Sequence, residues 1–65
     1  MFFNAFPVGT QMTVVNSDDD TPFSGFVAAD SHGDHYLACD DGVSTVYCSP
    51  AEVVYCSVQS DMLNV

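Results

Sequence analysis

The sequence predicts an all-β protein that folds as a single small domain of five or six short strands. Its 65 residues are enough for one small domain and no more. With 48% hydrophobic residues, including five Phe and three Tyr, the chain has enough apolar material for a compact core and lacks the composition of a disordered segment. Short runs of β-forming residues alternate with turn residues along the chain, which is typical of a small β-sheet protein.

The first two strands are expected at residues 10–15 and 23–29. Residues 10–15 alternate polar and apolar side chains, as a half-buried strand does. They end at residues 16–20, which we expect to form a turn-rich acidic loop. The second run follows Pro22 and contains Gly25, and a glycine inside a strand often marks a bulge or a sharp bend.

A turn at residues 30–34 leads into a third expected strand at residues 35–39. The next three residues, Asp40, Asp41 and Gly42, are a strong hairpin signal, because Asp-Gly pairs adopt the backbone angles that tight hairpins require. A fourth strand is therefore expected at residues 43–48.

A single turn of 3₁₀ helix is predicted near residues 49–52. Ser49 is a favoured N-cap residue, Pro50 suits the first helical position, and Glu52 lies three residues after the cap, which together make a capping box. A β-rich run resumes at residues 53–56, so there is room for one turn only. Residues 57–65 are expected to form either a sixth strand or a loose end.

This pattern resembles the SH3-like small β-barrels, especially their KOW- and Tudor-type members. The resemblance covers about residues 7–58. The matching stretches are Val8-Gly9-Thr10, Phe23-Ser24-Gly25-Phe26-Val27, Tyr36-Leu37-Ala38-Cys39-Asp40-Asp41-Gly42 and Ser49-Pro50-Ala51-Glu52-Val53. It implies a five- to six-stranded barrel that closes its own edges. It implies little about function, because such barrels serve many unrelated partners.

The charge balance is the main functional clue. The chain has nine acidic residues and no Lys or Arg, which gives a formal charge of -9, although roughly eight basic residues are expected in an average chain of this length. Proteins that bind nucleic acid neutralise phosphates with Lys and Arg, so direct nucleic-acid binding is not expected. Docking on an anionic membrane needs basic residues as well and is not expected either.

No targeting or anchoring segment is expected. The apolar start of the chain has no positive region and reaches a proline at Pro7, unlike a signal peptide. No apolar run approaches the roughly 20 residues of a transmembrane helix. The three cysteines are an odd number, which disfavours a fully paired secreted framework and favours the reducing cytoplasm.

The acidic residues suggest a protein that imitates the charge of DNA. Double-stranded DNA carries one negative charge per about 1.7 Å, so nine carboxylates match roughly 15 Å of duplex, which is commensurate with the expected size of the domain. In size and charge the chain resembles small acidic phage proteins that occupy the DNA-binding surfaces of gyrase, RNA polymerase, and restriction or CRISPR effectors. We therefore expect it to bind and inhibit a basic DNA-binding protein of a bacterial host.

Eight acidic residues are the candidate partner-binding residues in this interpretation. They are Asp18, Asp19, Asp20, Asp30, Asp34, Asp40, Asp41 and Glu52. The same charges are also compatible with an ordinary solvated surface, because Asp is a common turn residue. The alternative function is a non-catalytic SH3-like interaction module or subunit of a larger assembly, and a second copy of the chain is a further candidate partner.

Histidines and cysteines form the other constellation of interest. Two His and three Cys side chains have the right chemistry for zinc, but no Cys-x-x-Cys pair exists, so no metal or other cofactor is expected. A disulfide between Cys48 and Cys56 remains an open alternative. No catalytic residues are expected, because a reactive thiolate needs positive neighbours and the chain offers only histidine. The residues concerned are His32, His35, Cys39, Cys48 and Cys56.

The aromatic residues have two interpretations. Phe2, Phe3 and Phe6 precede the predicted strands and either cover an open end of the barrel or form an exposed patch. Burial is the commoner outcome, since so small a domain needs all the apolar area it can bury. The three tyrosines, Tyr36, Tyr47 and Tyr55, could have either role.

Overall fold

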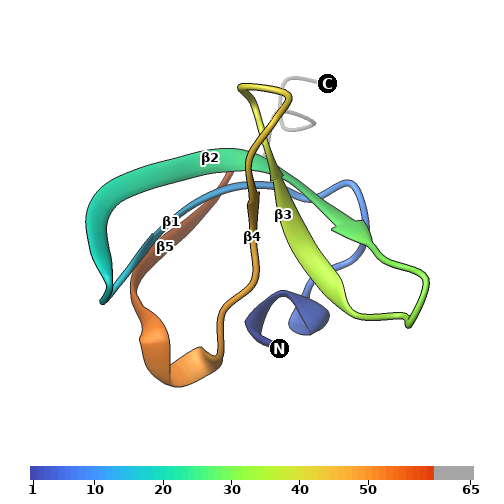
Figure 1. The fold of residues 1–65 in the computed structure, drawn as a ribbon, viewed down its shortest axis with the longest axis horizontal. Helices are drawn as coiled ribbons and strands as arrows, with labels where there is room; N and C mark the ends of the chain where they lie inside the picture. The colour runs from blue at the N-terminus through green and yellow to red at the C-terminus, as the bar shows by residue number, and fades with distance from the viewer. Residues whose placement is uncertain (60–65) are drawn as a thin grey trace.

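Five antiparallel strands and two short 3₁₀ helices make up the protein, as a computed structural model shows (Figure 1). The structure describes residues 1–59, except for the side chain of Asp19. The all-β class and the five strands predicted from the sequence are confirmed. In chain order the elements are η1 (Phe2–Ala5), β1 (Gln11–Asn16), β2 (Asp19–Ala29), β3 (His35–Cys39), β4 (Thr45–Val46), η2 (Pro50–Glu52) and β5 (Val53–Gln59).

The strands form one curved sheet in the order β4-β3-β2-β1-β5. Strands β4 and β5 are the two outer strands, and within residues 1–59 they do not pair with each other. The expectation of a closed barrel is therefore wrong. The long strand β2 pairs with β3 only from Gly25 onward, so its first half curves away together with β1 (Figure 1).

Strand β4 has only two residues, although a strand was expected over residues 43–48. The carboxylate of Asp41 accounts for the late start of the strand, because its Oδ1 accepts hydrogen bonds from the backbone N–H groups of Val43 and Ser44, both at 2.8 Å. At the other end the Cys48 carbonyl accepts a hydrogen bond from the Phe2 N–H of η1 at 2.8 Å. Such local bonds compete with a β-ladder for the same donors. The predicted hairpin does form, since β3 and β4 pair antiparallel across this turn, and Gly42 takes the positive φ of 78° that the turn requires.

The β1–β2 hairpin is tighter than the predicted acidic loop at residues 16–20. Asn16 pairs with Asp19, so only Ser17 and Asp18 form the turn, and β2 begins four residues earlier than expected. The pairing register shifts between Val14 and Asn16. Pro22 falls in the irregular stretch opposite, where its missing N–H costs the sheet little.

Gly25 is required by the close approach of the neighbouring strand. A Cβ at this position would overlap the backbone carbonyl of Ala38 and lie 2.8 Å from Cys39 Cα. The pairing of β1 with β2 is continuous through Gly25, so of the two expected features, a bulge or a sharp bend, the bulge is absent from this ladder.

The hydrophobic core lies on the concave side of the sheet. Its fully buried members come from the first four strands, from η1 and from the segment after β4: Phe3, Met12, Val14, Val27, Leu37, Val46 and Cys48. Helix η1 was not predicted and places Phe3 in the core, with Phe2 and Phe6 packed against it. The interpretation of these phenylalanines as core residues is therefore confirmed.

Helix η2 confirms the predicted single turn before the last strand. The Ser49 N–H donates to Glu52 Oε1 at 2.8 Å, and the Glu52 N–H donates to the Ser49 carbonyl at 3.0 Å. Strand β5 follows directly and extends to Gln59, so residues 57–59 of the expected sixth strand belong to it. The rest of that expectation, residues 60–65, lies outside the described residues. Between residues 1 and 59 no helix is long and apolar enough to span a membrane.

Candidate functional site

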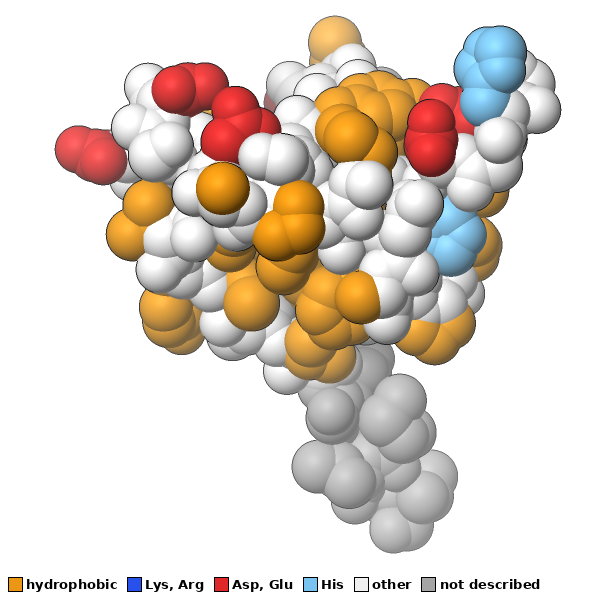
Figure 2. All heavy atoms as spheres, turned by 90° about the horizontal axis from the view of Figure 1, so that it is seen from below, with side chains coloured by type: hydrophobic (Ala, Val, Ile, Leu, Met, Phe, Trp, Pro, Cys, Tyr) orange, Lys and Arg blue, Asp and Glu red, His pale blue; other side chains and the backbone are white. Residues whose placement is uncertain are grey.

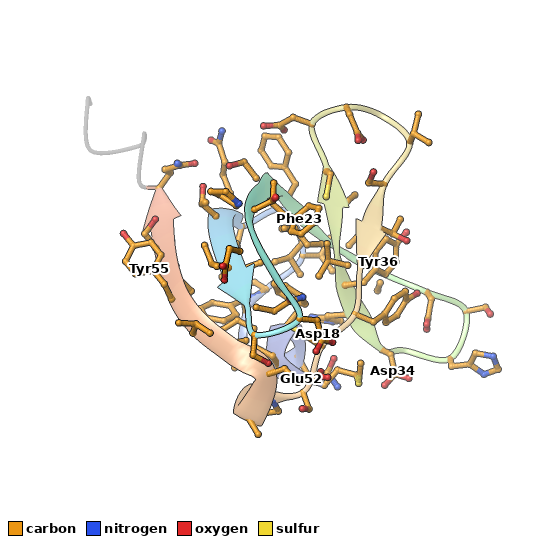
Figure 3. The ribbon with its side chains drawn as sticks, turned by 60° about the vertical axis from the view of Figure 1, so that its left-hand side comes forward. Asp18, Phe23, Asp34, Tyr36, Glu52 and Tyr55 are labelled. Carbon is orange, nitrogen blue, oxygen red and sulfur yellow. The ribbon has the colours of Figure 1, made fainter. Side chains whose placement is uncertain are left out.

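An open groove of about 420 Å³ lies between the β1–β2 hairpin and β4. Asn16, Asp18 and Phe23 line it on the hairpin side, and residues 44–47 line it on the β4 side. The groove exists because the sheet is open here: the first half of β2 pairs with β1 but not with β3, which leaves a gap beside the short β4. Figure 3 shows the hairpin with Asp18 and Phe23 on one side and Tyr36 on the other.

Aromatic side chains form part of both walls of this groove. Phe23 is half-buried and packs against the core. On the opposite wall Tyr47 is 46% exposed and stacks on Tyr36, with ring centroids 5.0 Å apart. Tyrosine is a residue type enriched at the centre of many protein interfaces.

One polar group of the groove lacks a partner. The Oδ1 atom of Asn16 is shielded from solvent and accepts no hydrogen bond from any residue in the described part of the chain. Buried polar atoms are nearly always paired in folded proteins. The hairpin side of the groove is therefore left with an unsatisfied acceptor.

A carboxylate lies at each wall of the groove. Asp18 is part of its lining. At the other wall the Tyr47 hydroxyl donates to Asp30 Oδ2 at 3.2 Å, so the β2–β3 loop that carries Asp30 and Asp34 adjoins the tyrosine. Figure 2 shows acidic side chains in two areas at opposite ends of the upper margin, with hydrophobic side chains between and below them. We call Asp18, Tyr47, Asp30 and Asp34 the groove-side set.

Hydrogen bonds fix the position of Asp30 within its loop. Its Oδ1 accepts from the backbone N–H groups of His32 at 2.9 Å and Asp34 at 3.0 Å. Burial raises the pKa of Asp30, but these two bonds and the Tyr47 hydroxyl outweigh it and hold the pKa below its ordinary value. Burial also raises the pKa of Tyr47, and the bond to Asp30 raises it further.

The other predicted site residues lie away from the groove or are engaged in the fold. Asp40 and Asp41 are in the β3–β4 turn, at the opposite end of β3 from the β2–β3 loop (Figure 1). Glu52 holds the cap of η2. Asp20 is an exposed residue of β2, and Asp19 is placed only as a backbone position in the same strand. Of the predicted site residues, Asp18 thus lines the groove, and Asp30 adjoins it through the Tyr47 hydroxyl, with Asp34 in the same loop.

The histidines and cysteines lie apart. Among residues 1–59 no group of three His, Cys, Asp or Glu side chains is arranged to hold a metal ion. His35 Nδ1 lies 2.8 Å from the Phe6 carbonyl oxygen and ties η1 to β3. Cys48 is buried in the core, Cys39 is half-buried and Cys56 is exposed; all three are free thiols, so Cys48 and Cys56 are not bridged.

Comparison with known proteins gives no relative. No protein-family model matches the chain, no curated protein matches it, and no solved structure matches it. A function therefore has to be inferred from the geometry and charge of this chain.

The groove itself was not predicted from the sequence. Tyr47 was recognised only as an aromatic residue with two alternative roles, and Asn16 and Phe23 were assigned to a loop and a strand. Their meeting depends on the sheet being open, and the short-range patterns that predict strands do not report closure. The sequence does contain one signal for a short β4. An Asp side chain often accepts hydrogen bonds from the backbone N–H groups two and three residues later, and Asp41 does so with Val43 and Ser44.

Proposed function

We propose that this chain is a non-catalytic acidic protein that binds the basic surface of a DNA-binding protein and blocks DNA from it. One observation carries the proposal: a groove with an aromatic side chain in each wall has one carboxylate, Asp18, in its lining and a second, Asp30, bonded to the Tyr47 hydroxyl, in a chain with nine acidic and no basic residues. The setting that fits this activity is the cytoplasm of a bacterial host, with the chain encoded by a phage.

Electrostatics selects the class of partner. Apart from histidine and the chain terminus, no group in the sequence carries positive charge to offset the carboxylates. The field around the protein therefore attracts basic surfaces and repels acidic ones. Surfaces that normally hold DNA are rich in Lys and Arg, so they complement this chain.

The groove adds an aromatic contact to the electrostatic attraction. An arginine side chain of the partner can lie against the exposed Tyr47 ring while its guanidinium pairs with Asp18. A cation over an aromatic face contributes about 0.5–2 kcal/mol, depending on how far water is excluded. Arginine and tyrosine are the residues in which interface binding energy most often concentrates.

The five strands and the last 3₁₀ turn also suggest which family of folds the sheet is related to. We propose that the sheet is an open variant of the SH3-like barrel that the sequence resembles. The five short antiparallel strands and the single 3₁₀ turn directly before the last one support this assignment. It adds no argument about function, because that architecture serves many unrelated partners.

Capture from a bacterial lysate tests the proposed function. The immobilised chain is expected to retain a DNA-binding protein that duplex DNA then elutes. Failure to retain any DNA-binding protein, or retention that duplex DNA does not reverse, would contradict the proposal.

A matched pair of variants tests the groove. Asp18 and Asp40 are both exposed, and neither carboxylate accepts a hydrogen bond from the described residues, so Asp18→Asn and Asp40→Asn remove the same charge at two places. We expect Asp18→Asn to weaken binding of the captured protein about fivefold and Asp40→Asn less than about twofold, because only Asp18 lines the groove. Equal losses in the two variants would show that the groove is not the contact.

The second candidate function is an interaction module or subunit that docks through an uncharged surface. The exposed apolar side chains of β5, Val54, Tyr55 and Val58, favour it. Binding of that kind tolerates salt, whereas binding through the groove-side set weakens as salt rises.

A further inference from the structure

Strand β5 has a free outer edge that carries no charge. It is the last strand in the sheet order, so within residues 1–59 one of its edges pairs with β1 and the other pairs with nothing. None of its seven residues is acidic or basic. Val54 is 68% exposed, Tyr55 57% and Val58 47%.

Free edges of this kind are usually protected. Natural sheets protect an edge with lysine, proline, inward-pointing charges, a β-bulge or a short strand. Strand β4, the other outer strand, has two residues and follows a turn with two aspartates. Of these protections strand β5 has only an irregularity at Val54, where its pairing register with β1 shifts, whereas its residues 55–59 pair regularly with β1. The edge of residues 55–59 is therefore available for pairing with another strand.

Part of the core side of β5 is uncovered. In the ladder with β1, Cys56 lies opposite Val14 and Val58 opposite Met12. Side chains of paired residues project from the same face of a sheet. Val14 and Met12 are fully buried, yet Cys56 and Val58 on the same face are exposed, because the open sheet brings no other strand over them.

We infer that β5 pairs antiparallel with β5 of a second copy of this chain, about a two-fold axis at Cys56. The apolar pattern of the sequence is symmetric about that residue, with Val54, at the register shift with β1, two positions before it and Val58 two positions after it. In this register each Val54 faces Val58 of the second copy and the two Cys56 side chains face each other, which is the self-complementary contact that two-fold symmetry requires.

Charge opposes a second copy least along the β5 edge. Two copies of a chain with a formal charge of -9 repel each other wherever carboxylates meet. The β5 edge is where two copies can approach without placing an acidic side chain of one strand against the other. The contact is small, so the dimer is expected to form reversibly with concentration. This inference does not depend on the proposed function, because β5 contributes nothing to the groove.

Two exposed valines provide a matched test. Val58→Glu adds a negative charge on the proposed contact, and Val43→Glu adds the same charge at a turn residue that is 85% exposed. Sedimentation equilibrium under reducing conditions, from low micromolar to submillimolar protein, is expected to show a dimer for the unmodified chain. We expect Val43→Glu to change its dissociation constant less than about twofold and Val58→Glu to weaken it at least about tenfold. A monomer throughout, or equal effects of both variants, would overturn the inference.

Thiol cross-linking checks the register independently. Directly opposed residues place their Cβ atoms about 4.5–5.5 Å apart, close to the separation in a disulfide. With copper(II) phenanthroline as electron acceptor, two Cys56 thiols lose two protons and two electrons and form one S–S bond between copies. We expect cross-linking in the unmodified chain and in Cys39→Ser, and none in Cys56→Ser. Cross-linking as fast in Val58→Glu, which keeps Cys56, would mean random collision and would contradict the register.

Discussion

Some carboxylates of this chain accept hydrogen bonds that hold turns, and others make no such bond. Asp30, Asp41 and Glu52 accept hydrogen bonds from nearby backbone N–H groups, so their charges position turns. The side-chain carboxylates of Asp18 and Asp34 accept none from the described residues; Asp18 lines the groove, and Asp34 is in the loop whose Asp30 bonds to Tyr47. A net charge therefore overstates how many acids are available to a partner.

Acid is expected to abolish the stabilisation that Asp41 gives its turn. Hydrogen bonds from the backbone and side chain of Ser44, and then from the Val43 N–H, lower the pKa of Asp41 below its ordinary value of 3.8. Because the folded-state pKa is the lower one, the stabilisation is complete above pH 3.8 and is lost as the pH falls through the folded value. We expect Asp41→Asn to lower the free energy of unfolding at pH 7, and this difference to shrink toward zero on acidification.

Urea unfolding at a series of pH values measures this effect. Asp40→Asn is the control, because it removes the same charge from the neighbouring residue without removing a hydrogen bond of the described chain. A destabilisation by Asp41→Asn that stays constant from neutral pH into strong acid would show that its carboxylate does not hold the turn.

A methyl group at Gly25 is expected to disrupt the pairing of β2 with β3. The added Cβ would overlap the backbone of Ala38, which cannot move without breaking the ladder. We expect Gly25→Ala to lower the free energy of unfolding by about 3 kcal/mol, as overpacking against backbone does. Val43→Ala, at a largely exposed position, is expected to change it by less than about 0.5 kcal/mol. Similar values for both variants in denaturant titrations would refute the close approach.

The elements themselves follow from short-range patterns to different degrees. Strand β3 has the predicted bounds, and β1 and η2 differ from prediction by one residue, because alternation, capping and turn residues are local signals. Strand β2 begins early because Asn16 and Asp19, which have the composition of a loop, pair with each other. Strand β4 begins later than predicted because the Asp41 carboxylate accepts hydrogen bonds from the N–H groups of Val43 and Ser44. In both strands the predicted first residue is wrong because an aspartate can belong to either a turn or a strand.

Helix η2 provides a prediction at the scale of an element. Its cap depends on the Glu52 carboxylate, so Glu52→Ala is expected to cost about 1 kcal/mol of stability. Glu52→Gln retains an acceptor oxygen and is expected to cost less than half as much. Thermal unfolding of the two variants checks this. If Gln is as harmful as Ala, the negative charge rather than the hydrogen bond supports the turn.

At the scale of the whole molecule, the fold class and the core follow from the sequence and the closure of the sheet does not. Closure requires the two outer strands, β4 and β5, to pair with each other, and β4 has only two residues. The opening produces both features that can bind a partner: the groove beside β4, flanked by Asp18 and Tyr47, and the uncovered edge of β5. The candidate acids lie in separate parts of the molecule: Asp30 and Asp34 are in the loop whose Asp30 bonds to Tyr47, and Asp40 and Asp41 are at the other end of β3.

The salt dependence of binding tests the central claim most directly. The dissociation constant of the complex with the captured DNA-binding protein is measured at about 50 mM and about 200 mM salt, and the account predicts that affinity falls about tenfold or more between them. An affinity that does not change over this range would contradict binding through the groove-side carboxylates.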